Sequence, residues 1–422
     1  MSILDLDGWQ EILSTLRRNA LRTTLTAVGV FWGVFMLIVM NGMGHGLEDG
    51  VMHDMSGLAT NSIFVWGDKT SLPYKGMAPG KWVELTRADA RALEQAIPEI
   101  EAVAPRSYLG GRGGKNLVTH NDKSGTFDIV GDVPAMNRIQ PEIILSGRFL
   151  NPIDLERNRK VAVIGNHVTE VLFPGVPDPV GSTIQIKGME FLVVGVFKPI
   201  ASGDRADRMS NTIHTPLTTF QQALRPDPWV NNFAVLVRDG ADTDAVDKRI
   251  HRELAQLHHF SPDDKEAVGS WNAEEEFRKT IGLFKGISLL IWFVGTVTLL
   301  AGIIGVSNIM MISVRERTRE IGVRRAIGAT PYSIIGQILK ESTVLTALAG
   351  CVGLGAGVGA LEAIGKLASS GGSGPSLFDA PRADFRVAIV ATLVVIVGGA
   401  LAGLFPALYA IRVRPVVALR DE

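Results

Sequence analysis

Four long apolar segments constrain this chain more than any other feature of its sequence. They cover residues 25–43, 283–313, 334–360 and 387–411, and none carries a charge near its centre. A helix needs about 20 mostly apolar residues to cross the hydrocarbon core of a bilayer, where a central charge costs about 2.5–3.5 kcal/mol. The sequence therefore predicts a membrane α-helical protein with four transmembrane helices.

The first apolar segment follows three arginines, as the apolar part of a signal peptide would. However, the segment is longer than the apolar part of a signal peptide, and no cleavage site of the A-x-A kind follows it. We expect it to remain as an uncleaved membrane anchor.

Basic residues flank the four segments unevenly. They precede the first segment, are dense between the second and third, and follow the fourth: Arg17, Arg18, Arg22, Arg315, Arg317, Arg319, Arg324, Arg325, Lys340, Arg412, Arg414 and Arg420. The loop between the third and fourth has only Lys366, Arg382 and Arg386. Because cytoplasmic loops carry an excess of lysine and arginine, we expect both termini in the cytoplasm and the region 44–282 outside it.

These predictions divide the chain into nine parts. In order, they are a cytoplasmic N-terminal amphipathic helix (1–24), transmembrane helix 1 (25–43), an outer domain ending in a stalk (44–282), transmembrane helix 2 (283–313), a basic cytoplasmic helix (314–333), transmembrane helix 3 (334–360), an outer loop (361–386), transmembrane helix 4 (387–411) and a cytoplasmic tail (412–422).

The region between the first two apolar segments mixes strand and helix signals. Residues 61–66 alternate as a strand does, and Thr86 with Asp89 three positions later predicts a capped helix. Short Val-, Ile- and Phe-rich runs follow, with a predicted hairpin at 182–196, and a charged helix begins at Asp242 or Thr243. We expect an α+β domain with two lobes: an α/β lobe built from both ends of the region and a β-rich lobe inserted between them. An amphipathic stretch at 272–285 should form the stalk.

Glycines in two of the apolar segments predict close helix packing. Gly295, Gly302 and Gly305 lie in the second segment, and Gly353 and Gly357 form a small-xxx-small pair in the third. Small residues let helix backbones approach closely in a membrane. The competing interpretation for the third segment is local flexibility.

The sequence carries no recognisable catalytic or metal-binding pattern. The glycine cluster 110–116 lacks the spacing of a phosphate-binding loop, and the histidines lack partners at ligand spacing. The single cysteine, Cys351, excludes a disulfide within the chain and a cysteine-based metal site. A net charge of −1 gives no reason to expect nucleic acid binding. We expect no cofactor in this chain. If ATP drives the protein, we expect the ATP-binding site on a partner chain, because no phosphate-binding loop is found here.

Residues 307–342 carry the strongest signal. A basic helix follows the second apolar segment, Gly328 breaks it and Pro331 opens the next helix. Apolar residues within the basic run, including Ile321 and Ile327, let the helix bury one side on a protein or in the surface of the membrane. The absence of Phe and Trp favours a protein.

This segment resembles the cytoplasmic coupling region of MacB/FtsX-type ABC transporter permeases. The matching residues are Asn308, Ile309, Met310, Ser313, Val314, Glu316, Arg317, Thr318, Arg319, Glu320, Ile321, Gly322, Arg324, Ala326, Ile327, Gly328 and Ala329. The C-terminus is similar to the family ending through Gly403, Pro406, Ala407, Ala410, Pro415, Ala418, Leu419, Arg420 and Glu422. Runs between LSGRFL and FLVVGVF look like the β-rich lobe of the family's periplasmic core domain. MacB itself carries an N-terminal ATPase domain with no counterpart here, so we expect the ATPase on another chain.

The resemblance implies a permease in the cell inner membrane that is not itself an enzyme. Its implied partners are a cytoplasmic ABC ATPase dimer, a second copy of the chain, membrane lipids and a periplasmic adaptor protein. Motion driven by ATP would pass along the helices to the periplasmic domain and drive efflux of material already in the periplasm. The residues expected to couple to the ATPase are Arg315, Glu316, Arg317, Glu320, Ile321, Arg324, Ile327 and Gly328. Gly295 and Gly302 are expected to face the second copy.

Three other functions compete with efflux. Two lie within the same family: release of lipoproteins from the inner membrane, and control of a cell-wall hydrolase. The third is a membrane-bound enzyme with a catalytic outer domain, which the lack of a catalytic pattern disfavours.

Overall fold

The computed structural model describes residues 20–55, 57–111, 113–201, 203–370 and 385–412. The predicted N-terminal amphipathic helix up to residue 19, most of the predicted loop 361–386 and the tail beyond residue 412 lie outside these residues. The chain forms two compact units. We call the unit Val51–Gly282 the sheet domain, and the unit that contains the long apolar helices the helical domain.

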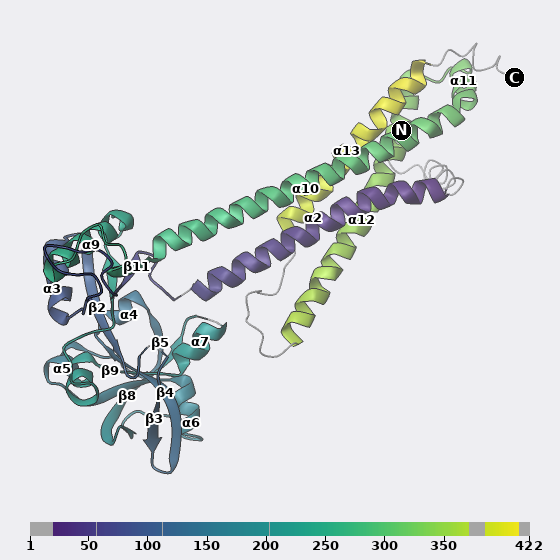
Figure 1. The fold of residues 1–422 in the computed structure, drawn as a ribbon. Helices are drawn as coiled ribbons and strands as arrows, with labels where there is room; N and C mark the ends of the chain where they lie inside the picture. Colours follow the sequence, from purple (N-terminus) through teal and green to yellow (C-terminus); the bar gives the residue numbers. More distant parts are fainter. Residues whose placement is uncertain (1–19, 56, 112, 202, 371–384, 413–422) are drawn as a thin grey trace. The chain divides into compact units, whose positions relative to one another are not determined.

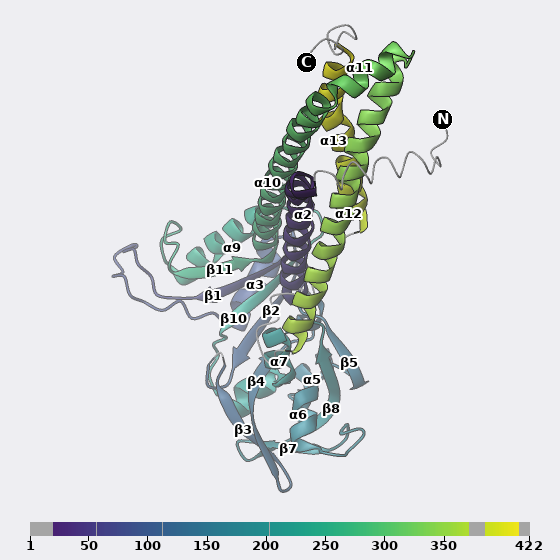
Figure 2. The same cartoon turned by 90° about the vertical axis from the view of Figure 1, so that its right-hand side faces the viewer.

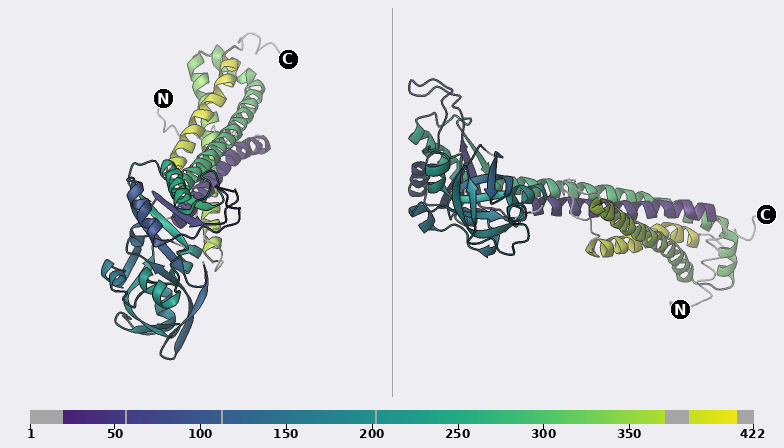
Figure 3. Two further views of the ribbon diagram at one scale, coloured as in Figure 1. Left: turned by 60° about the vertical axis from the view of Figure 1, so that its left-hand side comes forward. Right: turned by 90° about the horizontal axis from the view of Figure 1, so that it is seen from below.

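The helical domain contains four long helices, as predicted. They are α2 (Ala20–Met55), α10 (Ala273–Glu316), α12 (Pro331–Ser370) and α13 (Phe385–Arg412), and a short helix α11 (Thr318–Ala326) joins α10 to α12 (Figure 1). Among the described residues, these four helices are long and apolar enough to cross a membrane. Helices α2 and α10 run side by side (Figure 3), with an added Cβ at Gly29 only 3.6 Å from Gly302.

The helices differ from the predicted spans at their ends. Helix α2 continues past residue 43 to Met55, and α12 continues past residue 360 to Ser370. Residues 44–55 contain no proline, so nothing ends the helix where the apolar run ends. Helix α10 begins at Ala273 and is 44 residues long, so the predicted stalk and second span form one helix.

The first lobe of the sheet domain is built from both ends of the region, as predicted. Its antiparallel strands follow the order β11 (Val268–Asn272), β1 (Ser62–Gly67), β10 (Asn232–Val237) and β2 (Ile100–Tyr108). Helices α3 (Arg87–Ala96) and α9 (Thr243–His258) contribute Leu93 and Ile250 to its core. Thr86 and Asp89 form the predicted capping box of α3, and Asp242 is the N-cap of α9.

The second lobe is a closed sheet. Its strands are β3 (Lys115–His120), β4 (Lys123–Asp132), β6 (Val161–Gly165), β7 (Thr183–Ile186), β8 (Met189–Pro199) and β9 (Thr212–Pro216), with β5 (Glu142–Gly147) added to β8 (Figure 2). Pairing follows β4–β3–β7–β8–β6–β9, and β9 pairs back to β4. Phe127, Phe191 and Ile213 lie in its core with residues of α6 (Asn166–Leu172).

The predicted hairpin joins β7 to β8. Its turn consists of Lys187 and Gly188, both with positive φ (48° and 78°), and Ile186 lies opposite Met189. Two successive residues with positive φ are typical of the type I′ turn, whose twist matches that of the flanking strands.

Few backbone contacts join the sheets of the two lobes. Strand β2 pairs with β4 only through Ser107 with Gly131 and Tyr108 with Val130. After β4 the chain passes through the short helix α4 (Met136–Ile139), which packs on the first lobe, and then enters β5 of the second. The remaining helices of the domain are α5 (Pro152–Glu156), α7 (Gly203–Ser210), α8 (Leu217–Thr219) and a π-helical turn, Phe220–Leu224.

Candidate functional site

The predicted coupling segment forms a corner between α10 and α12 (Figure 1). Helix α10 ends at Glu316, α11 covers Thr318–Ala326 and α12 begins at Pro331. Gly328 has a φ of +108°, which only glycine adopts readily, so it turns the chain from α11 towards α12. The break at Gly328 and the start of the next helix at Pro331 are confirmed, but the predicted helix 314–333 is divided further, because α10 ends at Glu316 and α11 begins at Thr318.

One face of α11 contacts the chain's own helices. Arg324 donates hydrogen bonds to Gln337 of α12 (2.9 Å) and to Glu320 (2.8 Å). An Arg317 Nη atom lies 3.6 Å from a carboxylate oxygen of the buried Glu341. Ile321 packs against the apolar core of the helical domain. This face consequently holds α11 against α12.

Another part of the corner is apolar and exposed. Ile327 and Tyr332 are 83% and 85% exposed, and Val323 is 37% exposed. We call these three residues the apolar tip. These exposed apolar side chains lie in a segment that is otherwise rich in charge, and burial by a partner would remove their surface from water, which makes the apolar tip the part of the corner best suited to bind another protein.

The remaining predicted coupling residues are held near the corner in different ways. The Arg315 guanidinium lies 5.6 Å from the centre of the Tyr409 ring of α13. Arg325, which was not among the predicted residues, donates a hydrogen bond to the Ile411 carbonyl (2.8 Å). Glu316 is exposed at the end of α10. The eight predicted residues thus do not form one surface, and Ile321 faces the chain's own core, whereas Ile327 faces outward.

The predicted packing glycines contact α2 of the same chain. A Cβ added at Gly302 would lie 3.2 Å from the Gly29 backbone, and one at Gly295 would lie 2.9 Å from Leu37. A Cβ at Gly353 or Gly357 would meet the Phe31 carbonyl at 2.6 Å or the Ile38 Cβ at 3.0 Å. Contrary to expectation, Gly295 and Gly302 therefore pack within one chain rather than facing a second copy. A Cβ at Gly305 would meet no described atom within 4 Å.

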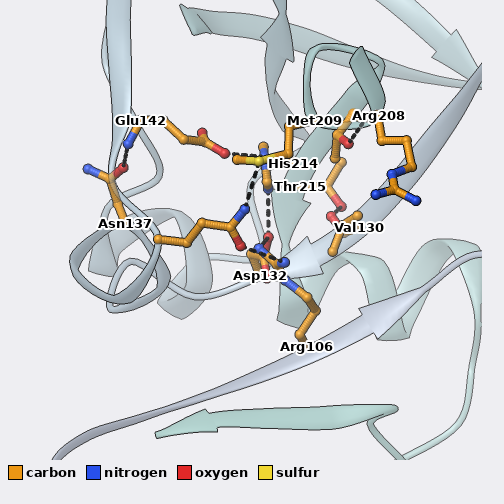
Figure 4. A network of polar contacts seen from close by, with 11 residues as sticks. Arg106, Val130, Asp132, Asn137, Glu142, Arg208, Met209, His214 and Thr215 are labelled. Atoms are coloured by element: carbon orange, nitrogen blue, oxygen red, sulfur yellow. Dashed lines mark hydrogen bonds and ion pairs between the residues drawn. The ribbon is translucent and has the colours of Figure 1, made fainter. Parts of the chain in front are cut away.

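The sheet domain contains a buried network of charges that the sequence reasoning missed (Figure 4). Asp132 of β4 accepts hydrogen bonds from Arg106 Nε (2.6 Å) and Nη2 (2.9 Å) on β2, and it lies 2.6 Å from His214 Nδ1 on β9. The other ring nitrogen of His214 lies 3.2 Å from a Glu142 carboxylate oxygen on β5. All four side chains are buried, and they lie where β2 of the first lobe meets β4 of the second.

Electrostatics keep this network charged. Burial disfavours ionisation of Asp132, but the charge of Arg106 and the contact with His214 outweigh burial and hold the pKa of Asp132 below its usual value. Burial also disfavours the His214 cation, but Glu142 and Asp132 outweigh it and raise the pKa of His214 to about 9. At neutral pH the cations of Arg106 and His214 thus lie beside the ionised Asp132, and Glu142 lies 3.2 Å from the other ring nitrogen of His214.

The described residues offer little to a metal or a small cofactor. Within them, no three histidine, cysteine or carboxylate side chains are grouped as metal ligands would be. The Arg106 guanidinium donates hydrogen bonds to both Asp132 oxygens, and His214 contacts one of them, so the network serves as a structural cluster rather than a ligand set.

Two family models match the sequence. The MacB-like periplasmic core domain matches residues 23–253, and the FtsX-like permease C-terminal region matches residues 292–415. Curated relatives include the macrolide export ATP-binding/permease protein MacB of Rhodospirillum rubrum, 32% identical over 97% of this chain and 59% of the relative. Another is the pyoverdine export ATP-binding/permease protein PvdT of Pseudomonas syringae pv. syringae, 31% identical over 96% of this chain and 58% of the relative.

The chain thus spans less than two thirds of the length of these relatives. Among solved structures, it is similar to the periplasmic region of MacB from Actinobacillus actinomycetemcomitans. That similarity has 17% sequence identity and a TM-score of 0.44, and it covers 55% of this chain and 97% of the other.

Proposed function

This chain belongs to the family of permeases that combine a MacB-like periplasmic core domain with an FtsX-like C-terminal region, and on that basis we propose that it is the permease subunit of an ABC-type exporter in the cell inner membrane. In this proposal both termini are cytoplasmic and the sheet domain is periplasmic. The names of the relatives, which refer to export of macrolides and of pyoverdine, support export as its direction of transport.

The permease would transmit motion rather than catalyse a reaction. ATP would be bound and hydrolysed by a dimer of cytoplasmic ABC ATPases, and two copies of the permease would act together with a periplasmic adaptor protein. The observation that supports transmission is the continuity of α10, which extends without a break from the end of β11 to the corner at Glu316. A helix of 44 residues is about 66 Å long, enough to join events on the two sides of a membrane.

The exposure of the apolar tip is the single observation that supports binding of the ATPase at this corner. Ile327 has 83% of its surface exposed at the end of a helix rich in arginine and glutamate. An aliphatic side chain in this position stabilises a complex when a partner buries it, while the exposed ion pairs around it are each worth only about 0.2–1 kcal/mol. We propose that Val323, Ile327 and Tyr332 enter a groove on the ATPase.

The substitution Ile327→Asp tests this assignment in the full chain with the purified ATPase. Loss of a side chain from a desolvated groove costs about 2 kcal/mol or more, which is roughly 30-fold in affinity. The variant should insert and fold normally, yet it should bind the ATPase at least 30-fold more weakly and no longer stimulate its hydrolysis. Ile321→Asp is unsuitable, because Ile321 packs in the chain's own core and its loss would disturb the fold.

A matched control is Leu117→Asp, which also places an aspartate at an exposed aliphatic position (62% exposed) but on β3 of the sheet domain. It should leave ATPase binding and stimulation unchanged. If Ile327→Asp binds and stimulates the ATPase normally and only its affinity for lipid vesicles falls, then the apolar tip is a membrane anchor and the docking proposal is wrong.

A further inference from the structure

Residues 68–83 form a ribbon that extends beyond the end of β1 and returns to the sheet domain before α3 (Figure 2). Its two arms are paired: Lys69 lies opposite Trp82 in antiparallel register, and the Thr70 N–H donates a hydrogen bond to the Lys81 carbonyl (2.9 Å). The ribbon begins where β1 pairs with the first residue of β11, whereas α10 follows the last residue of β11. It therefore projects from the end of the sheet opposite the start of α10.

Two sets of hydrogen bonds hold the ribbon in a fixed shape. At its tip, Tyr74 and Met77 exchange two backbone hydrogen bonds (3.1 and 2.9 Å). Closer to the sheet, the buried Asp264 carboxylate accepts hydrogen bonds from the N–H groups of Ser71 (2.7 Å) and Leu72 (2.9 Å) and from the Ser71 hydroxyl (2.7 Å). Burial disfavours ionisation of Asp264, but these hydrogen bonds outweigh it and hold its pKa below the usual value. A surface that is already ordered loses little conformational entropy when a partner binds.

Positive charge is concentrated on the ribbon. Lys69, Lys75 and Lys81 are exposed, and residues 69–82 contain no aspartate or glutamate. Among the residues that the structure describes, none of these three lysines forms an ion pair with a carboxylate. Arginines elsewhere in the sheet domain, such as Arg148 and Arg249, do lie 2.6 Å from carboxylate oxygens. The three lysine charges are therefore available to a negatively charged partner.

Aromatic and apolar side chains lie beside these charges. Trp82 is 54% exposed and Leu72 is 41% exposed. The Lys69 Nζ lies 5.3 Å from the centre of the Trp82 ring, and the Lys75 Nζ lies 5.1 Å from the centre of the Tyr74 ring. Tryptophan and tyrosine are the side chains that most often dominate binding energy once a partner buries them, and charges around them steer a partner of opposite charge. The ribbon thus combines an apolar anchor with a cationic rim.

The shape and position of the ribbon favour a protein partner. The hollow that the ribbon forms with Phe260 has an empty space of about 300 Å³ including its open mouth, which is at the lower limit for a small-molecule site. Two ribbons that met each other would bring lysines of like charge together, which disfavours a second copy. The ribbon also lies at the end of the sheet opposite α10, the helix that continues into an apolar span, which disfavours a lipid surface.

We propose that the ribbon is the docking site for an acidic segment of the periplasmic adaptor protein. The inference rests on the proposed function, which supplies the adaptor as a partner but assigns it no surface. Carboxylates of the adaptor lie against Lys69, Lys75 and Lys81, and an apolar side chain of the same segment covers Trp82. The pairing of the arms and the Asp264 contacts keep these side chains in place before the adaptor arrives.

The test measures binding of the full chain, purified in detergent, to the purified adaptor of the same transporter. A ribbon variant that combines Lys69→Gln, Lys75→Gln and Lys81→Gln should bind roughly tenfold more weakly, because each exposed ion pair contributes at most about fivefold. The affinity of the unaltered chain should fall as the salt concentration rises, and that of the ribbon variant should fall much less. Trp82→Ala should weaken binding roughly 30-fold, as expected for loss of a buried anchor.

The matched control replaces Lys123, Lys160 and Lys198 with glutamine, because these are exposed lysines of the second lobe and the same charge is lost. The control should bind the adaptor as the unaltered chain does, and all variants should keep the melting temperature of the unaltered chain, since the replaced side chains are exposed.

Three outcomes would overturn the proposal. Full adaptor binding by the ribbon variant and by Trp82→Ala, or an equal loss in the lysine control, would place the adaptor elsewhere while leaving it a partner of this permease. Normal adaptor binding together with lost binding to phosphatidylglycerol vesicles would make the ribbon a membrane contact. Failure of the unaltered chain to bind the adaptor would contradict both this docking site and the adaptor in the proposed function.

Discussion

Replacing Asp132 with asparagine should weaken the junction between the two lobes of the sheet domain. The Asp132 carboxylate is fully buried and contacts both Arg106 and His214 at 2.6 Å. An amide of the same size has no charge, so two buried cations would be left with the single carboxylate of Glu142. Removing one partner from a buried ion pair costs about 3–5 kcal/mol, and we take about 3 kcal/mol because the asparagine oxygen still accepts a hydrogen bond.

The assay is thermal unfolding of the full chain in detergent, followed by tryptophan fluorescence. Trp271 reports on the sheet domain because its ring packs against Phe64 of β1 at 5.7 Å. For a domain of this size, each kcal/mol shifts the melting temperature by roughly 2–4 °C, so Asp132→Asn should lower it by roughly 6–12 °C. Asp122→Asn is the control, because Asp122 is exposed and pairs only with its neighbour Lys123. Equal melting temperatures for the two variants would refute the importance of the buried charge.

The remaining predictions concern pH, packing and topology. The pKa of His214 is raised to about 9 from an ordinary 6.5, so its contribution to stability is complete below about pH 6.5 and is lost as the pH rises through 9. Urea unfolding should therefore show a stability that declines over this pH range, and His214→Gln should abolish the decline. An unchanged decline in the variant would exclude His214 as its cause. Gly302→Leu should destabilise the helical domain by about 1–3 kcal/mol through overpacking against α2, as measured by thermal unfolding. Gly305→Leu should have no such effect, because a Cβ added at Gly305 meets nothing within 4 Å. A cysteine in place of Asp178, in a chain whose Cys351 is replaced by serine, should react with an impermeant maleimide in intact spheroplasts; protection would contradict a periplasmic sheet domain.

Local structure was predictable wherever the signal lies within a few residues. The capping box of Thr86 and Asp89 spans three positions, and the turn at Lys187 and Gly188 lies between two alternating runs. The end of α2 was predicted too early, because an apolar pattern marks where a helix meets lipid and not where it stops.

The buried network could not be assembled from the sequence. Arg106, Asp132, Glu142 and His214 come from four strands, and only the closure of the second lobe and its pairing with β2 bring them together. The sequence does show a charged residue or histidine inside an apolar strand. That pattern indicates a buried side chain, but it does not indicate which residue the side chain contacts. Ile321 and Ile327 likewise look equivalent in the sequence, and only packing distinguishes the buried side chain from the exposed one.

Labelling at the apolar tip tests the central claim most directly. In a Cys351→Ser chain, a single cysteine replacing Ile327 should react rapidly with maleimide when the permease is alone, because this position is 83% exposed. A saturating amount of the ATPase should slow that reaction at least tenfold, which corresponds to about 1.4 kcal/mol of protection. A cysteine replacing Leu117 should react at the same rate with and without the ATPase. If the cysteine at position 327 reacts equally fast in both conditions while the ATPase is bound, the corner between α10 and α12 is not where this permease receives its motion.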